Sequence, residues 1–380
     1  MSKRLKAFIK NETVLVISAL LAIVSIAAVP PDRQYADYIH WSTLSTLMCL
    51  MLVMTGLREL GIFRYFGRQL LRKRSHSRSV VLVLVSLCFF CSPFITNDVA
   101  LITFVPFTIF VLEYAGLHKY MIPVLSLQTI AAHMGSMISP VGNPHNIYLF
   151  GLMNEHSGAG AADFILMMLP FFLLAGFLLV VLTFLFTIEN EAIIQRPYNR
   201  EIRFRGRDAS LIMMYAALFV ISLLPVFGLF RYYYALTAVL AAILIFDRKT
   251  VKQTDYSLLF TFMFLFILVG NLGRIQALND ALTSIVSGNE LMVSVAASQV
   301  ISNAPASILL SGFTDEYFLL ALGTDLGGLG TLIASMANLI SFKKYTEVKN
   351  SSPLRYILGF TLINLIFLVP MLIAAGLLTS

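Results

Sequence analysis

The stretch SPFITNDVALITFVPF, residues 92–107, decides how this chain folds. It places three polar residues, Thr96, Asn97 and Asp98, inside an apolar segment that runs from residue 79 to residue 112. A carboxylate at bilayer depth costs several kcal/mol, and a polar break is tolerated there only where the backbone faces protein or a water-filled cavity. We therefore interpret 79–112 as a re-entrant hairpin whose tip, at Asn97 and Asp98, lines a site.

The composition supports a membrane location for this hairpin. Hydrophobic residues make up 58% of the 380 residues and charged residues only 12%, whereas a soluble domain carries about 25% charged residues. The three cysteines, Cys49, Cys88 and Cys91, lie in apolar segments and form no disulfide framework. The fold class expected is an all-α polytopic membrane protein that contacts membrane lipids.

Apolar runs near the length of a membrane-spanning helix predict the crossings. Full crossings are expected at 13–30, 38–57, 163–187, 210–230, 233–247, 257–273 and 354–378, and broken ones at 120–152 and 317–342. A second re-entrant hairpin, matching the first, is expected at 291–314.

Lys and Arg are distributed as this layout requires. With a cytoplasmic N-terminus, the cytoplasmic segments are 1–12, 58–78, 113–119, 188–209, 248–256 and 343–355. All but three of the 27 Lys and Arg, namely Arg33, Arg231 and Arg274, fall in them, as the positive-inside rule demands. We expect a protein of a bacterial-type inner (plasma) membrane with its C-terminus on the periplasmic or extracellular side. The net charge of +7 lies on these loops, so no nucleic-acid partner is expected.

The two halves form an inverted repeat in this layout. The predicted parts are scaffold helices in 1–57, a connector, hairpin and broken helix in 58–187, a linker loop and helix in 188–232, scaffold helices in 233–273, and a second connector, hairpin, broken helix and last helix in 274–380. The connectors are expected to lie at the membrane interface as amphipathic segments, with ordinary loops as the alternative. Polar breaks at matching places in two halves are typical of secondary transporters.

The four polar breaks supply the candidate substrate-binding residues. These are Thr96, Asn97, Gly142, Asn143, His145, Asn146, Ser302, Asn303, Ser335 and Asn338. Gly142 and Pro144 prevent a continuous helix in the first broken crossing, and glycines at 323, 327, 328 and 330 permit unwinding in the second. Amides and helix ends can bind an anion or coordinate a cation without a charged side chain. A kink filled by neighbouring side chains is the alternative at each break.

Two carboxylates, Asp98 and Asp325, are expected at membrane depth and are the candidates for ion coupling. Asp98 is preferred because it lies beside Asn97, and a buried carboxylate can exchange a proton near neutral pH. The alternatives are a helix-capping Asp98 and an Asp325 near the outer mouth. His133 could relay protons or simply pack. Since no Lys or Arg falls at the breaks, an anion would be held by helix ends and amides, whereas a neutral oxyacid needs no positive charge.

At these segments the chain resembles a superfamily that includes arsenite-efflux permeases, NhaD-type sodium/proton antiporters and divalent-anion/sodium symporters. It is most similar to the YbiR-type inner-membrane proteins, which are regarded as anion transporters. The resemblance is carried by TNDVAL at 96–101, GNPHN at 142–146, SQVISNAP at 298–305, LGGLG at 326–330 and SMAN at 335–338. It covers nearly the whole chain.

The resemblance implies a dimeric scaffold, here a homodimer, and a transport domain that moves as an elevator. It further implies a possible sodium ion at Thr96, Asn97 and Asn143, since the symporters bind sodium at Ser-Asn-Thr hairpin tips. Here Asp98 and Ala304 replace the threonines of those tips. The Asp resembles the arsenite permeases, and the Ala removes a hydroxyl ligand.

These observations favour a secondary active transporter of a small anion or its neutral oxyacid, coupled to protons or sodium, with no other cofactor. A sodium/proton antiporter in which Asp98 binds the cation is the alternative. A membrane-embedded enzyme is not favoured, because the six histidines form no HExxH pattern. A passive channel suits inverted hairpins less well than alternating access does.

The charge distribution yields a first prediction, about topology. A cysteine added after Ser380 should react with a membrane-impermeant maleimide applied to intact cells, because the layout places the C-terminus outside. A cysteine inserted after Lys249, in an expected cytoplasmic loop, is the matched control and should react only after lysis. Labelling with the opposite pattern would overturn the layout.

Overall fold

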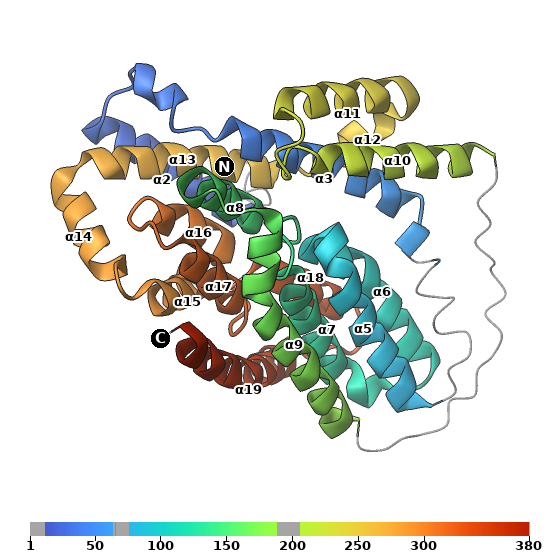
Figure 1. Ribbon diagram of the computed structural model, residues 1–380. Helices are drawn as coiled ribbons and strands as arrows, with labels where there is room; N and C mark the ends of the chain where they lie inside the picture. Colours follow the sequence, from blue (N-terminus) through green and yellow to red (C-terminus); the bar gives the residue numbers. More distant parts are fainter. Residues whose placement is uncertain (1–11, 64, 66–75, 188–205, 380) are drawn as a thin grey trace, which may run out of the picture.

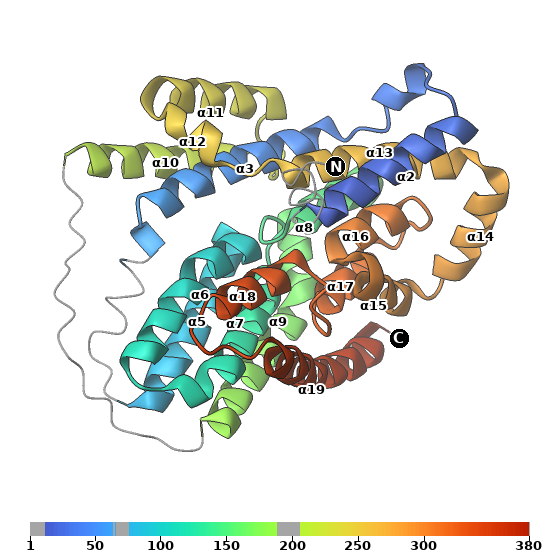
Figure 2. The same ribbon diagram turned by 180° about the vertical axis from the view of Figure 1, so that it is seen from behind.

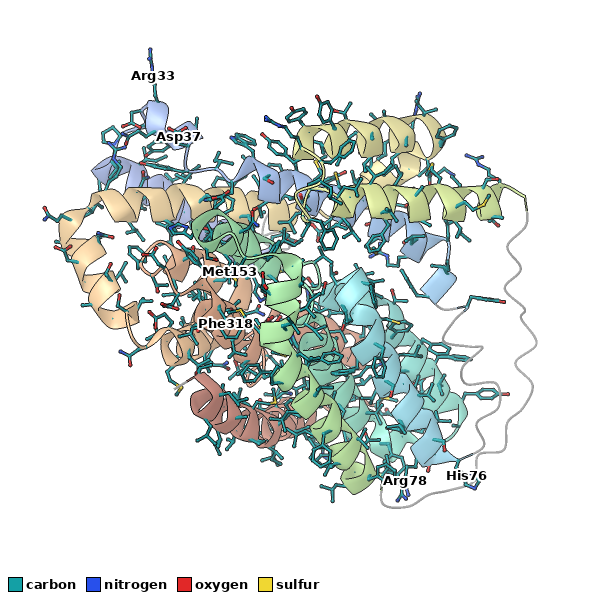
Figure 3. All side chains as sticks on the ribbon, in the orientation of Figure 1. Arg33, Asp37, His76, Arg78, Met153 and Phe318 are labelled. Atoms are coloured by element: carbon teal, nitrogen blue, oxygen red, sulfur yellow. The ribbon has the colours of Figure 1, made fainter. Side chains whose placement is uncertain are left out.

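The computed structural model of the protein describes residues 12–63, 65, 76–187 and 206–379, in which the regular elements are helices (Figure 1). Helices α9 (Ala161–Phe186) and α19 (Pro353–Thr379) turn apolar side chains outward, as Figure 3 shows. Phe177 is 65% exposed and Leu377 75% exposed. Apolar surface of this extent on long helices is suited to contact with lipid or with another membrane-embedded protein.

The helices of the first half follow the predicted order. They are α2 (Thr13–Ala28), the short 3-10 helix η1 (Arg33–Ala36), α3 (Trp41–Glu59), α5 (Ser77–Ile95), α6 (Asn97–Tyr114), η2 (His118–Tyr120), α7 (Met121–Ser136), α8 (Pro144–Ser157) and α9. The first hairpin is therefore α5 and α6, and the first broken crossing is α7 and α8. Most of the first expected connector lies outside the described residues.

The second half repeats this order after a linking helix, α10 (Arg207–Leu223). Its helices are α11 (Tyr232–Phe246), α12 (Arg248–Gln253), α13 (Ser257–Arg274), α14 (Gln276–Val286), α15 (Glu290–Ile301), α16 (Asn303–Ser311), α17 (Tyr317–Gly327), α18 (Met336–Thr346) and α19. Helix α14 is the second connector, and the sequence did not predict α12.

The lengths of the hairpin helices show which of them could cross a membrane and which must turn back inside it. Six helical segments of the described chain, among them α5 and α6, are long and apolar enough to cross a membrane. Helices α15 and α16 have only 12 and 9 residues, so at about 1.5 Å per residue neither crosses a hydrocarbon core of about 30 Å. Both hairpin tips end inside the protein, where Asn97 and Asn303 are buried.

The two tips share one unusual backbone conformation. Thr96 has φ 65° and ψ 153°, and Ser302 has φ 75° and ψ 150°. Positive φ is unfavourable for residues with a Cβ and persists where the surroundings hold it. Here the Asn97 N–H donates to the Gly142 carbonyl at 3.2 Å, and the Asn303 N–H donates to the Ala334 carbonyl at 2.9 Å. Each tip is thus fastened to the break in its own repeat.

The two repeats interlock rather than sit side by side. Helix α2 packs on α13 and α11 packs on α3, while α6 packs on α18 and α16 on α8. In both views α2, α3, α10, α11 and α13 form one layer and the hairpins and broken helices form the other (Figures 1 and 2). The inverted repeat with two hairpins and two broken helices is therefore confirmed.

Small residues allow each hairpin to press against its broken helix. Gly135 of α7 meets Ser92 and the Phe89 carbonyl of α5, and Gly327 of α17 meets Ser298 of α15. A Cβ at either glycine would overlap these atoms. The contact fixes how close the hairpin tip comes to the break.

Gly135→Ala tests this contact. The added methyl should cost roughly 1–3 kcal/mol, because the carbonyl of Phe89 cannot move without distorting α5. We expect a lower thermal unfolding midpoint in detergent. Gly151→Ala is the matched control, since its Cβ would meet nothing within 4 Å. Equal midpoints for the two variants would contradict the packing described.

Candidate functional site

The starts of four helices meet at the centre of the fold. Helices α6 and α16 begin at the hairpin tips, while α8 and α18 begin where the broken crossings resume. Asn143 and Ser335 occupy the N-cap positions of α8 and α18 with similar extended backbones. Each helix start carries a partial positive charge, so the sequence places four of them around one region.

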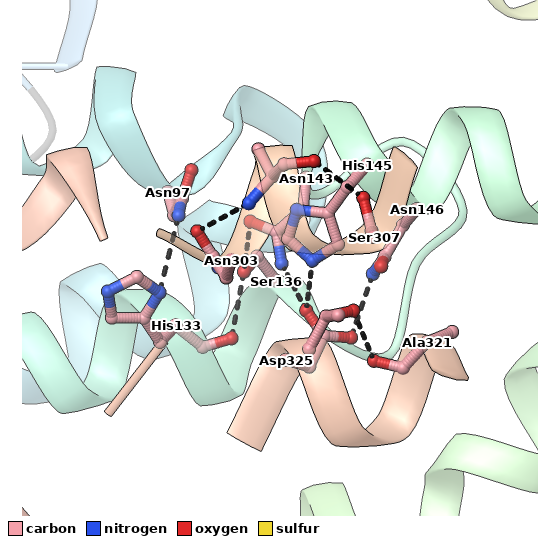
Figure 4. A network of polar contacts seen from close by, with 12 residues as sticks. Asn97, His133, Ser136, Asn143, His145, Asn146, Asn303, Ser307, Ala321 and Asp325 are labelled. Carbon is pink, nitrogen blue, oxygen red and sulfur yellow. Dashed lines mark hydrogen bonds and ion pairs between the residues drawn. The ribbon is translucent and has the colours of Figure 1, made fainter. Parts of the chain in front are cut away.

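A buried carboxylate, Asp325 of α17, holds the first half of the site together (Figure 4). Its Oδ1 accepts a hydrogen bond from Asn143 Nδ2 at 2.6 Å and lies 3.1 Å from His145 Nε2. Its Oδ2 accepts from Asn146 Nδ2 at 3.0 Å. Asp325 is 1% exposed, and a buried carboxylate is tolerated when it is paired and hydrogen-bonded in this way. Asp325 therefore lies in the interior of the described fold, where the two repeats meet.

A buried imidazole, His133 of α7, holds the second half. Asn97 Nδ2 lies 3.3 Å from His133 Nδ1, and His133 Nε2 lies 2.9 Å from Asn338 Oδ1. Both contacts are satisfied by a neutral ring with its proton on Nε2, which accepts from Asn97 and donates to Asn338. Asn338 Nδ2 in turn donates to the carbonyls of Gly328 and Thr331 across the second break.

His133 and Asp325 occupy equivalent positions in the two repeats, because each lies two residues before the close-packed glycine of its helix, Gly135 or Gly327. Asn146 and Asn338 are likewise equivalent, each three residues after an N-cap. The pairs Asp325–Asn146 and His133–Asn338 are therefore the same contact made twice, once in each direction between the repeats.

A small pocket of about 30 Å³ separates the hairpin tips from the scaffold layer. The residues that line it from the breaks are Asn97, Asp98, Pro144, His145, Ser302, Asn303, Ala304, Pro305, Ser335 and Met336, and those from α2 and α13 are Val14, Leu258, Thr261 and Phe262. Three of the lining residues carry polar atoms without a hydrogen-bond partner in the described part of the chain. Ser302 Oγ and Asn303 Nδ2 are buried and unpaired. The Asp98 carboxylate forms no hydrogen bond or ion pair in the described part of the chain, although its backbone N–H donates to Asn97 Oδ1.

The structure divides the predicted site residues between the pocket and the network behind it. Asn97, His145, Ser302, Asn303 and Ser335 line the pocket. Asn143, Asn146 and Asn338 lie in the network, and Gly142 contributes its carbonyl to the first tip. Thr96 forms the strained first tip and does not line the pocket.

The proposed sodium ligands do not fit one ion. Thr96 and Asn143 do not line the pocket, in contrast to Asn97. Asn143 Oδ1 already accepts from Ser136 Oγ at 2.9 Å. We therefore assign no sodium site to this set.

Two further polar residues belong to the network: Ser136, which the sequence did not single out, and Gln299, for which the sequence left a proton relay and simple packing open. Ser136 ends α7 and orients Asn143. Gln299 of α15 donates to the carbonyls of Gly327 and Leu329 at 2.8 Å each and accepts from the Thr331 N–H. Gln299 thus braces the second break, and its position four residues before Asn303 was the available signal.

The sequence profile of the citrate transporter family, CitMHS, matches residues 6–316. The chain belongs to this family. The resemblance to the ion transporter superfamily is thereby confirmed, and with it a multi-pass membrane transporter. Its CitMHS-type relatives bear the names of transporters and membrane proteins rather than of enzymes.

Two relatives of this CitMHS-family chain match most of both lengths. The uncharacterised transporter MJ0456 of Methanocaldococcus jannaschii is 34% identical over 308 residues, covering 80% of this chain and 81% of the relative. The inner membrane protein YbiR of Escherichia coli is 31% identical over 319 residues, covering 82% of each.

A solved structure shares the fold. The YdaH transporter of Alcanivorax borkumensis superposes with a TM-score of 0.57 at 14% identity, over 96% of this chain and 97% of the other. Its title describes an unusual topology. At 14% identity this similarity shows that the two proteins share a fold and nothing more.

Asp325→Asn tests the network. The amide would point an N–H at one of the donors of Asn143, His145 or Asn146, which leaves buried groups unsatisfied at about 1–3 kcal/mol each. We expect a lower unfolding midpoint and loss of transport. The exposed Asp280→Asn on α14 is the matched control and should leave both unchanged. Wild-type stability in Asp325→Asn would show that the network is not needed.

Proposed function

We propose that the protein is a secondary active transporter of a small anion or its neutral oxyacid. The observation that carries this proposal is the pocket at the hairpin tips, which Asp98, Ser302 and Asn303 line. The buried Ser302 Oγ and Asn303 Nδ2 have no hydrogen-bond partner among the described residues, and because buried polar groups are normally satisfied, unpaired ones in residues that line a cavity favour a ligand nearby. The four surrounding helix starts favour electron-rich oxygen atoms in that ligand.

The position of the pocket supports alternating access by an elevator. One wall consists of the tips and breaks of the hairpin layer, and the other of Leu258, Thr261 and Phe262 on α13. A ligand would therefore lie between two layers that can slide past each other. The hydrogen bonds that fasten each tip to a break would keep the site intact while its layer moves as one body. We further propose that the scaffold layers of two copies of the chain associate as a homodimer.

Asp98 is the proposed coupling group. It lines the pocket together with Asn303, whereas Asp325 is fully engaged by three donors. A carboxylate that is free to meet both ligand and coupling ion can link their movements. Protons are preferred to sodium here because Asn143 Oδ1, one of the oxygens expected to bind sodium, already accepts from Ser136 Oγ.

One observation favours sodium/proton exchange as a second candidate. The residues that line the pocket include the Asp98 carboxylate and neither Lys nor Arg, which suits a bound cation. In that case Asp98 itself would bind sodium and protons in turn, and no other substrate would be required.

Proton flux in proteoliposomes distinguishes these functions. A trapped pH dye should report a proton movement when an oxyacid is added to wild-type protein, and Asp98→Asn should abolish it by removing the proton carrier. Asp37→Asn, exposed beside η1, is the matched control. A signal from sodium alone would favour the antiporter, and an unchanged signal in Asp98→Asn would exclude Asp98 from coupling.

A further inference from the structure

Side chains from both hairpin tips and from α7 meet in the space left by one glycine. A Cβ on Gly328, at the end of α17, would lie 2.9 Å from Asn303 Nδ2 and 3.2 Å from His133 Nδ1. Asn97 Nδ2 lies 3.3 Å from the same His133 Nδ1 (Figure 4). The amides of both tips therefore come close to one ring nitrogen, at a point where no side chain separates them.

The hydrogen bonds of Asn338 fix the proton on this ring. Asn338 Nδ2 donates to the carbonyls of Gly328 and Thr331 at 2.9 Å each, so its Oδ1 is the atom that faces His133 Nε2 at 2.9 Å. An oxygen there requires the ring proton on Nε2. In a neutral imidazole the other nitrogen, Nδ1, is then an acceptor with a single lone pair.

The two tip amides are oriented by their own backbones. Asn97 Oδ1 accepts from the Asp98 N–H at 2.7 Å, and Asn303 Oδ1 accepts from the Ala304 N–H at 3.0 Å. Each side chain is left with its Nδ2 as a free donor, so two donors compete for one lone pair. Asn97 holds it through a long contact, and Asn303 Nδ2 is buried without a partner among the described residues.

We propose that His133 is a positioning residue shared by the two hairpin tips, whose Nδ1 accepts from Asn97 or from Asn303 but not from both at once. When one amide gives up Nδ1, the other can take it, because the two donors are chemically identical. The acceptor then stays paired in either arrangement. A change at one tip therefore alters the free energy of the other.

The shared nitrogen links two tips that differ in charge. Asp98 follows Asn97 at the first tip, whereas Ala304 follows Asn303 at the second. A ligand oxygen that accepts from one amide would leave His133 Nδ1 to the other, so that both buried amides are satisfied. This consequence rests on the proposed function, whereas the sharing of Nδ1 can be measured without any transported molecule.

A double-mutant cycle on thermal unfolding in detergent measures the sharing. Asn97→Ala and Asn303→Ala should each leave Nδ1 paired with the remaining amide. The variant with both changes should lose about 2 °C more than the two single losses together, because Nδ1 then has no donor. Loss of the bond to the Asp98 N–H occurs in both backgrounds and cancels. Asn97→Ala with the exposed Asn289→Ala is the matched control and should be additive.

Additive losses for Asn97→Ala and Asn303→Ala would overturn the sharing. They would leave the proposed function untouched, because the cycle contains no transported molecule.

Nitrogen NMR with isotope-labelled histidine gives a readout that overall stability cannot imitate. The Nδ1 resonance of His133, identified by its loss in His133→Gln, distinguishes a hydrogen-bonded ring nitrogen from a free one. Asn97→Ala should leave it at the hydrogen-bonded position, since Asn303 takes over. Adding Gly328→Ala should then move it to the free position, because the new methyl fills the space between the two groups. A free resonance in Asn97→Ala alone, or a protonated Nδ1 in the wild type, would contradict the proposal.

Discussion

The carboxylate of Asp325 is the interaction on which the centre of the protein depends. A negative charge inside an apolar helical layer is stable only with donors around it, and all three donors come from the opposite repeat. The same group therefore satisfies its own burial, orients the N-cap residue Asn143, and joins the two broken helices. His133 makes the equivalent contact in the other direction with a neutral ring. The repeats are alike in geometry and different in charge.

The polar side chains at the centre fall into two groups, those already hydrogen-bonded within the protein and those still able to bind a ligand. The groups that are committed to the network, including Asn143 and Asn146, cannot also hold a substrate without giving up a buried partner. The residues with side-chain atoms left unpaired, Asp98, Ser302 and Asn303, line the pocket that borders the scaffold. A transporter must carry its site through a movement, and a rigid polar interior behind a few free groups is suited to that task.

Much of this arrangement could be predicted from the sequence. Long apolar runs and the positions of Gly, Pro and Asn place the hairpin tips and both breaks within a few residues. The role of Asp325 could not be predicted, because its donors are 182, 180 and 179 residues away in the chain and the sequence does not say which way α17 turns. The positive φ of Thr96 could not be predicted either, because threonine rarely adopts it, and Ser302 shares it at the second tip.

The crossed pairing between the repeats also has a consequence for biosynthesis. When Asn143 leaves the ribosome, its partner Asp325 is still 182 residues away, which corresponds to roughly ten to forty seconds at about 5–20 residues per second. During that interval the first hairpin and its broken helix enter the membrane with their amides and His145 unpaired. The newly inserted first half is therefore an incomplete intermediate, held by the insertion machinery or by water until translation delivers the acid that closes it.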